Sequence, residues 1–131
     1  MISWGRPAIN PFAAGLAIGI CLRAFAGFLR GTMLYHCVYF WLKPELTAAQ
    51  RAEFRAGVET LRGIKAVSKV SIGVPAATAR RPVIDHSYDV ALIIECQDVA
   101  AEAAYQVDPL HLAFVEKNKQ FWTRVQIYDS E

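Results

Sequence analysis

The sequence predicts an α+β domain in which four strands form one antiparallel sheet and two helices cover one face of it. Two observations carry this prediction. Four apolar stretches have the two-residue alternation, or the β-branched and aromatic composition, of strands. Two other stretches carry helix caps and a helical apolar period, and they separate the first strand from the second and the third from the fourth. The predicted order is therefore strand–helix–strand–strand–helix–strand.

The first strand and the first helix are the most clearly marked elements. Residues Leu34–Leu42 are rich in aromatic and β-branched side chains, and Lys43-Pro44 ends the strand. Thr47, followed by Gln50 three residues later, is a capping box. We therefore expect a helix that begins at this point and continues to about Leu61.

Two strands separated by a loop follow the first helix. Residues Ala66–Val74 alternate in polarity and end at a proline, which predicts the second strand. Residues Ala76–Ser87 contain Pro82 and have no apolar period, so we expect a loop. Residues Tyr88–Glu95 form the most apolar stretch, which predicts a strand in the centre of the sheet.

The second helical stretch is interrupted. Asp98 is an N-cap for a helix that runs to about Gln106. Asp108-Pro109 then restarts a helix, with the aspartate as N-cap and the proline in the first helical position, and this second piece continues to about Lys119. Residues Phe121–Tyr128 are the last predicted strand.

This order of elements is the ferredoxin-like arrangement, and it leaves one face of the sheet without helices. On the first strand His36, Val38, Phe40 and Leu42 share one face, and Tyr35, Cys37, Tyr39 and Trp41 share the other. Both faces are largely apolar, so both should be covered. A second copy of the chain can cover the helix-free face, and we therefore expect a homodimer that stacks face to face as a dimeric α/β barrel.

The composition limits the classes of protein to which the chain can belong. The chain has 131 residues, 54% hydrophobic and 20% charged, which is typical of a single folded domain. The net charge of +2 and the scattered basic residues argue against nucleic acid as a partner. None of the three cysteines lies at a metal-binding spacing. Cys37 and Cys96 lie in apolar strands, so we expect free thiols and a cytoplasmic location.

The first 33 residues differ from the rest. The apolar run Phe12–Leu22 is too short to cross a bilayer. Arg6 precedes it as in a signal peptide, but no convincing cleavage site follows. We interpret residues 1–33 as a leader or non-native extension, with Met33 as the natural start, and residues 34–131 as the domain. The alternative is a short amphipathic helix that docks on the domain or on a membrane surface.

Three segments carry a resemblance to a known family. Residues His36–Lys43 are similar to the family's opening strand, which starts with histidine and has lysine near its end. Tyr88-Asp89 begins the third strand, and Tyr105–Phe114 is similar to the pattern Tyr-x-x-His-Pro-x-His-x-x-Phe. Together they resemble the stress-responsive dimeric α/β-barrel (Dabb) family. Two positions depart from it: Trp41 stands where many members have a lysine, and Asp108 replaces the first histidine of the third segment.

The resemblance implies a site. The family includes a plant polyketide (olivetolic acid) cyclase, which closes a poly-β-keto chain by aldol condensation and depends on a tyrosine and a histidine that match Tyr105 and His111. His111 falls in the first turn of a helix, where the helix dipole favours the neutral imidazole that can accept a proton. We expect His111 as catalytic base and the Tyr105 hydroxyl as donor to the enolate oxygen, in a cofactor-independent lyase.

The ligand would be a small hydrophobic or aromatic molecule in a cleft between sheet and helices. The residues expected to bind it are His36, Val38, Phe40, Phe54, Phe114 and Trp122. The alternative is that these side chains are simply core, and that His111 packs locally. His36 and His111 are too few ligands to predict a metal site, and no cofactor is expected. His86 lies in the polar loop and should be solvated.

Two other functions remain open at this point. One is a non-enzymatic structural or stress-response homodimer whose cleft is only a core. The other is a haem-dependent monooxygenase-like barrel, in which His111 or His36 would supply the axial ligand. Loss of ligand binding in a stable His111→Ala variant would distinguish the cleft from a core, and a haemin titration would test for haem.

Overall fold

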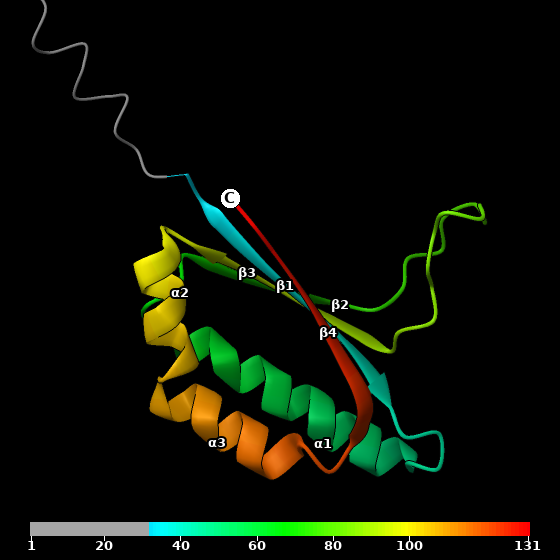
Figure 1. The fold of residues 1–131 in the computed structure, drawn as a ribbon. Helices are drawn as coiled ribbons and strands as arrows, with labels where there is room; N and C mark the ends of the chain where they lie inside the picture. Colours follow the sequence, from blue (N-terminus) through cyan, green and yellow to red (C-terminus); the bar gives the residue numbers. More distant parts are fainter. Residues whose placement is uncertain (1–31) are drawn as a thin grey trace, which may run out of the picture. The chain divides into compact units, whose positions relative to one another are not determined.

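The computed structural model describes residues 32–131, and these form the predicted α+β fold (Figure 1). The predicted order of elements is confirmed, with the second helix in two pieces. The elements are β1 (Leu34–Leu42), α1 (Ala48–Glu59), a short 3₁₀ helix (Thr60–Gly63), β2 (Lys69–Gly73), β3 (Val90–Cys96), α2 (Val99–Gln106), α3 (Pro109–Asn118) and β4 (Trp122–Ser130).

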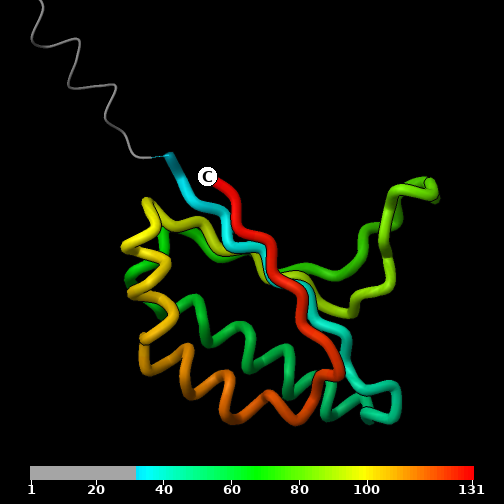
Figure 2. The backbone as a smooth tube through the Cα atoms, in the orientation of Figure 1, coloured from blue at the N-terminus to red at the C-terminus, as the bar shows by residue number. Residues whose placement is uncertain are grey.

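All four strands are antiparallel and lie in the order β2-β3-β1-β4. The third strand, β3, lies in the interior of the sheet, as predicted. The other interior strand is β1, which pairs with β3 on one side and with β4 on the other. The three helices lie on one side of the sheet (Figure 1). The first and last strands run side by side along their whole length (Figure 2). Their register pairs His36, near the start of β1, with Asp129, near the end of β4.

Each helix begins at the cap that the sequence predicts. The Thr47 side chain accepts a hydrogen bond from the Gln50 backbone at 3.2 Å, and the Gln50 side chain accepts one from the Thr47 backbone at 2.9 Å. Asp98 caps α2, and Asp108 caps α3 with Pro109 following it. These side chains satisfy backbone N–H groups that have no partner within the helix. The break at Asp108 sets the direction in which α3 leaves α2.

Three strand ends differ from the predictions by two or three residues. The second strand begins at Lys69 rather than Ala66, because it pairs only with β3 and that ladder starts at Lys69. The third strand begins at Val90, because Asp89 accepts a hydrogen bond from the Leu42 backbone at 2.7 Å and forms a connection instead. The last strand extends to Ser130, where β1 still offers it a pairing partner.

The two faces of β1 are divided as the alternation predicts. Its even-numbered residues from Leu34 to Leu42 are buried beneath the helices, whereas Tyr35, Tyr39 and Trp41 are exposed or half-buried on the helix-free face. The core between sheet and helices contains Phe54, Val58 and Leu61 of the first helical segment, all fully buried. Burial of each such side chain stabilises the fold by roughly 1.5–3 kcal/mol.

The interpretation of residues 1–33 falls outside the described residues, apart from Thr32 and Met33. It therefore stays a prediction. Within residues 32–131, no helix has both the length and the hydropathy needed to cross a membrane.

Candidate functional site

A cavity of about 180 Å³ lies between the sheet and the helices α2 and α3. Most of its wall is apolar, and the polar side chains in it come from two directions: His36 from the sheet, and Tyr105, Gln106 and His111 from the helices. The full lining is His36, Val38, Phe40, Leu92, Tyr105, Gln106, His111, Phe114, Val115, Trp122, Val125 and Ile127. An apolar cavity with a few convergent polar groups is the usual form of a small-molecule site.

The cavity brings together all but one of the residues that the sequence singled out. The exception is Phe54, which is fully buried and does not line the cavity. Its ring packs against those of Phe40, at 5.2 Å between centroids, and Phe114, at 6.1 Å. Phe54 thus supports two lining residues and is itself a core residue.

Tyr105 and His111 are neighbours in space although six positions separate them. Their ring centroids are 4.5 Å apart. The break between α2 and α3 brings them together, because Tyr105 lies in the last turn of α2 and His111 in the first turn of α3. The cap at Asp108 therefore positions both side chains at once.

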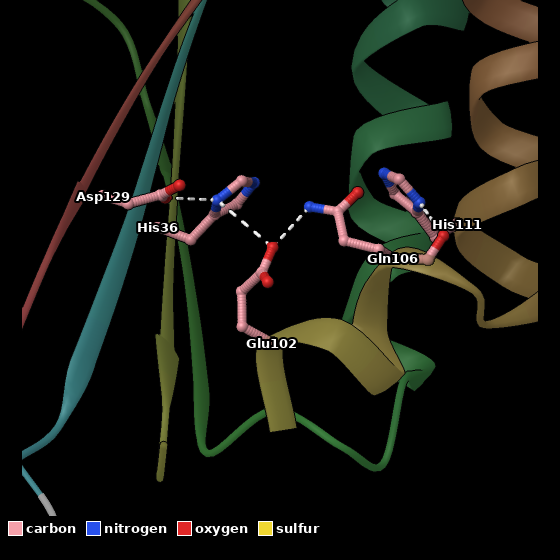
Figure 3. A network of polar contacts seen from close by, with 5 residues as sticks. All are labelled: His36, Glu102, Gln106, His111 and Asp129. Atoms are coloured by element: carbon pink, nitrogen blue, oxygen red, sulfur yellow. Dashed lines mark hydrogen bonds and ion pairs between the residues drawn. The ribbon is translucent and has the colours of Figure 1, made fainter. Parts of the chain in front are cut away.

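One hydrogen bond determines the tautomer of His111. Its Nδ1 lies 3.0 Å from the backbone carbonyl oxygen of Gln106, near the C-terminal end of α2. A carbonyl oxygen can only accept, so Nδ1 must carry the proton. In the neutral ring the lone pair is then on Nε2, which Figure 3 shows on the side of the ring away from that carbonyl. His111 thus has the tautomer that a base acting through Nε2 requires.

The Tyr105 side chain is almost completely enclosed, with 1% of the residue exposed. Burial raises the pKa of its hydroxyl far above the ordinary value, and the nearby Cys96 and Glu102 add to the shift. The hydroxyl therefore stays protonated at neutral pH and is a permanent hydrogen-bond donor. This is the property that stabilisation of a developing oxyanion needs.

This shift makes a prediction about stability. The pKa of Tyr105 is higher in the folded chain than its ordinary 10.0, so above that pH the unfolded chain loses this proton and the folded chain keeps it. The free energy of unfolding should fall by an extra ~1.4 kcal/mol per pH unit in the wild type, relative to Tyr105→Phe. Urea unfolding of both proteins at several alkaline pH values measures this. Equal pH dependence in the two proteins would contradict the burial of a titrating hydroxyl.

His36 lies at the sheet side of the cavity, in a polar network (Figure 3). Only 3% of the residue is exposed. Its Nδ1 is 2.7 Å from an Asp129 carboxylate oxygen and 3.9 Å from one of Glu102. The first distance is a hydrogen bond, and the second is too long for one. Glu102 in turn accepts a hydrogen bond from the Gln106 side chain at 2.6 Å.

Sequence reasoning missed Glu102, Gln106 and Asp129. A signal for Asp129 existed, because the first and last strands of this fold are neighbours and an acidic residue near the end of β4 can face a histidine near the start of β1. For Glu102 and Gln106 the signal was weaker. They are one helical turn apart on α2, but their direction depends on how α2 lies on the sheet.

Within residues 32–131, no three histidine, cysteine or acidic side chains gather in a way that could hold a metal ion. A cavity of about 180 Å³ is well below the range of pockets that hold larger organic ligands, so a porphyrin would have to displace the lining side chains. The Cys37 and Cys96 thiols are free, as predicted, and burial raises the pKa of both.

A second and larger hollow, of about 290 Å³, lies over the helix-free face of the sheet. Its lining includes Tyr39, Trp41, Tyr88 and Tyr128, and the Arg124 guanidinium lies 4.2 Å from the Trp41 ring centroid. We treat the smaller cavity as the candidate site, because its lining includes Tyr105, His36 and His111 and that of the larger hollow does not. The larger hollow belongs to the face for which the sequence predicts a second copy of the chain.

The fold and the cavity together define a ferredoxin-like α+β domain with a small pocket between its two layers. The family model of the stress-responsive A/B barrel domain (Dabb) matches residues 34–131, and the chain belongs to this family. The predicted resemblance is confirmed. A comparison with curated proteins finds none that matches the sequence.

Solved structures with the same fold come from bacteria and plants. A Dabb family protein from Mesorhizobium loti is 25% identical, with a TM-score of 0.62, over 76% of this chain and 95% of that one. A dimeric protein of unknown function from Bacteroides fragilis is 17% identical, with a TM-score of 0.60, over 76% and 95%. A hydroxynitrile lyase from Passiflora edulis is 17% identical, with a TM-score of 0.63, over 75% and 91%.

Proposed function

We propose that this chain binds a small, largely apolar molecule in the cavity and acts on it as a cofactor-independent lyase or cyclase. The observation that carries the proposal is the pairing of Tyr105 and His111, whose rings lie 4.5 Å apart in the wall of the cavity. Tyr105 supplies a hydroxyl that stays protonated, and His111 supplies an imidazole whose Nε2 can accept a proton. A base and a donor side by side are what removal of a proton next to a carbonyl group requires.

The volume of the cavity limits the size of the ligand. An apolar cavity of about 150 Å³ in another protein accommodates benzene. The cavity here, at about 180 Å³, therefore suits a molecule with one aromatic ring or a chain of similar size. The apolar lining would hold the ring, and the reacting carbonyl or hydroxyl would face Tyr105 and His111.

The chemistry follows from the two groups. His111 Nε2 takes a proton from the carbon next to a carbonyl, and the electron pair moves onto the carbonyl oxygen. The Tyr105 hydroxyl donates a hydrogen bond to that oxygen as its charge develops. The enolate can then form or break a carbon–carbon bond. The hydroxynitrile lyase from Passiflora edulis supports a lyase activity in general, because a lyase already occurs on this fold.

The test uses a probe that reports on a base alone. Benzisoxazole opens when a base removes its ring C–H proton, the N–O bond breaks, and the phenolate of hydroxybenzonitrile leaves. Its formation can be followed by absorbance. We expect the purified chain to accelerate this opening with saturation kinetics. A rate that rises only linearly with benzisoxazole concentration, at the level of free imidazole, would contradict the proposal.

We further propose that two copies of the chain pack through the helix-free face of the sheet. Tyr35 and Tyr128 on this face are 43% and 60% exposed, beside the aromatic side chains of Tyr39 and Trp41. Exposed aromatic groups in one patch usually mark an interface. The Bacteroides fragilis protein with this fold is dimeric, which supports the proposal.

A further inference from the structure

Gln106 is a polar lining residue of the cavity that the proposed reaction does not use. The base in that reaction is His111, and the donor is the Tyr105 hydroxyl. The backbone carbonyl of Gln106 accepts the hydrogen bond from His111 Nδ1, and its half-buried side chain also belongs to the cavity wall. A polar group in a mostly apolar wall fixes the orientation of a ligand and discriminates between ligands.

Glu102 determines which way the Gln106 amide faces. The two residues are one helical turn apart on α2, and the Gln106 side-chain nitrogen donates to the Glu102 carboxylate at 2.6 Å. Glu102 lies in the first turn of α2, where the positive end of the helix dipole favours an ionised carboxylate. An ionised carboxylate can only accept, so the nitrogen of the amide must face Glu102 and the oxygen must face away.

The amide oxygen is therefore a fixed acceptor next to the base. Figure 3 shows the nitrogen of the Gln106 amide toward Glu102 and the oxygen on the side of His111. The Glu102 side chain is only 18% exposed, and a hydrogen bond that is shielded from water is stronger than an exposed one. This hydrogen bond uses an N–H group and leaves both lone pairs of the oxygen for a donor on a bound molecule.

We propose that Gln106 determines specificity by accepting a hydrogen bond, through its side-chain oxygen, from a hydroxyl or N–H group of the substrate. This inference rests on the proposed function, in which Tyr105 and His111 act on the carbonyl part of the same molecule. Glu102 is a positioning residue that does not touch the substrate. The substrate class narrows accordingly to one-ring carbonyl compounds that carry a second polar group, and that group is a hydrogen-bond donor.

The selection depends on what a ligand without this donor leaves behind. A methyl group in place of the hydroxyl would displace water from the Gln106 oxygen and offer no hydrogen bond in return. An acceptor that loses its partners on binding lowers the affinity, and a site built around a polar group therefore rejects the apolar analogue of its ligand. For a neutral hydrogen bond of this kind the expected discrimination is roughly five- to tenfold in Kd.

The experiment compares ligands of matched size. Catechol and resorcinol carry a second hydroxyl, and o-cresol and m-cresol carry a methyl group in its place. NMR titration of the cavity methyl groups gives each Kd for wild type, Gln106→Met and the control Gln97→Met. Methionine resembles glutamine in shape but has no N–H group and only a weak acceptor. Gln97 is exposed and lies outside the cavity lining.

The measured quantity is the Kd of the cresol divided by the Kd of the matching diol. Comparing this ratio between proteins cancels the difference in hydration between the two ligands. We expect Gln106→Met to lower the ratio roughly five- to tenfold for at least one of the two pairs. Gln97→Met should keep the ratios of wild type. Benzisoxazole has no donor, so Gln106→Met should still open it.

Glu102→Gln tests the positioning without altering Gln106. A glutamine side chain can donate as well as accept, so the Gln106 amide can turn around. We expect the ratio to fall between those of wild type and Gln106→Met. Carbon NMR of the labelled glutamine side chains gives a second readout: the Gln106 Cδ resonance of wild type should shift with a diol and not with the matching cresol. Both measurements test the inference even if Gln106→Met does not fold.

The outcomes separate this inference from the proposed function. Equal ratios in wild type and Gln106→Met, with benzisoxazole opening retained in both, would overturn the role of Gln106 alone. A Gln106 Cδ resonance of wild type that responds alike to diols and cresols would do the same. Wild type that binds none of the four ligands and does not open benzisoxazole refutes the proposed function as well.

Discussion

Replacing His111 with glutamine should lower the rate of benzisoxazole opening by roughly 10²- to 10⁴-fold, the usual contribution of a general base. Glutamine has no basic nitrogen, so it cannot take the ring proton. Its side-chain N–H group can still donate to the Gln106 carbonyl that His111 Nδ1 contacts at 3.0 Å. The free energy of unfolding should therefore change by no more than about 1 kcal/mol. Stopped-flow or steady-state absorbance and urea unfolding measure the two effects.

His86→Gln is the matched control for this variant. His86 lies in the connection between β2 and β3, and its Nε2 contacts only the Thr78 hydroxyl among the described side chains, at 3.3 Å. The same chemical change there should leave the rate as in wild type. If His111→Gln destabilises the chain by several kcal/mol and leaves the rate unchanged, His111 is a structural residue and the base lies elsewhere.

Replacing Tyr39 with glutamate should dissociate the proposed dimer. Tyr39 lies in the centre of the helix-free face, with its ring 4.9 Å from that of Tyr88 and 6.2 Å from that of Tyr128. A carboxylate at this position would be desolvated by the second copy, and the Arg124 guanidinium that lines the same hollow is already held over the Trp41 ring. We expect a loss of about 2–4 kcal/mol of association free energy, which is enough to give monomer at micromolar concentration.

Sedimentation velocity at several concentrations measures this effect. Leu112→Glu is the control, because Leu112 is an exposed apolar residue of α3 and the same charge there should not disturb the dimer. A wild type that sediments as a monomer would remove the proposed interface. A Tyr39→Glu variant that stays dimeric would move the interface to another face.

Interactions between residues close in sequence were sufficient to predict the helices and strands, and to predict which side chains lie on each face of the sheet. Thr47, Asp98 and Asp108 mark helix starts because their side chains accept hydrogen bonds from the next backbone N–H groups, which is a purely local interaction. The alternation along β1 predicts its two faces for the same reason, since successive side chains of a strand point in opposite directions.

Strand ends depend on partners that are distant in sequence. The Asp89 side chain accepts a hydrogen bond from the Leu42 backbone, 47 positions away. Asp89 therefore belongs to the connection, and β3 begins one residue later, at Val90. The last strand continues to Ser130 because Tyr35 pairs with it. No local pattern around either position encodes these contacts.

The residues of the candidate site also fall into two groups: those that a local pattern predicts, and those that depend on contacts between distant parts of the sequence. The family pattern placed Tyr105 and His111 in one segment, and the structure shows how the helix break joins them. Phe54 and Phe114 are both apolar helix residues in the sequence, but only Phe114 points into the cavity. The hydrogen bond between His36 and Asp129 spans 93 positions and depends on the pairing of the first and last strands.

The central claim is that a one-ring molecule binds between the sheet and the helices beside Tyr105 and His111. The most direct test is NMR of the methyl-labelled chain with phenol. We expect intermolecular nuclear Overhauser effects from phenol to the methyl groups of Val38, Val125 and Ile127, which line the cavity. Val83, in the exposed connection between β2 and β3, should show none. Contacts to Val83 alone, or no contacts to the three cavity residues at saturating phenol, would contradict the account.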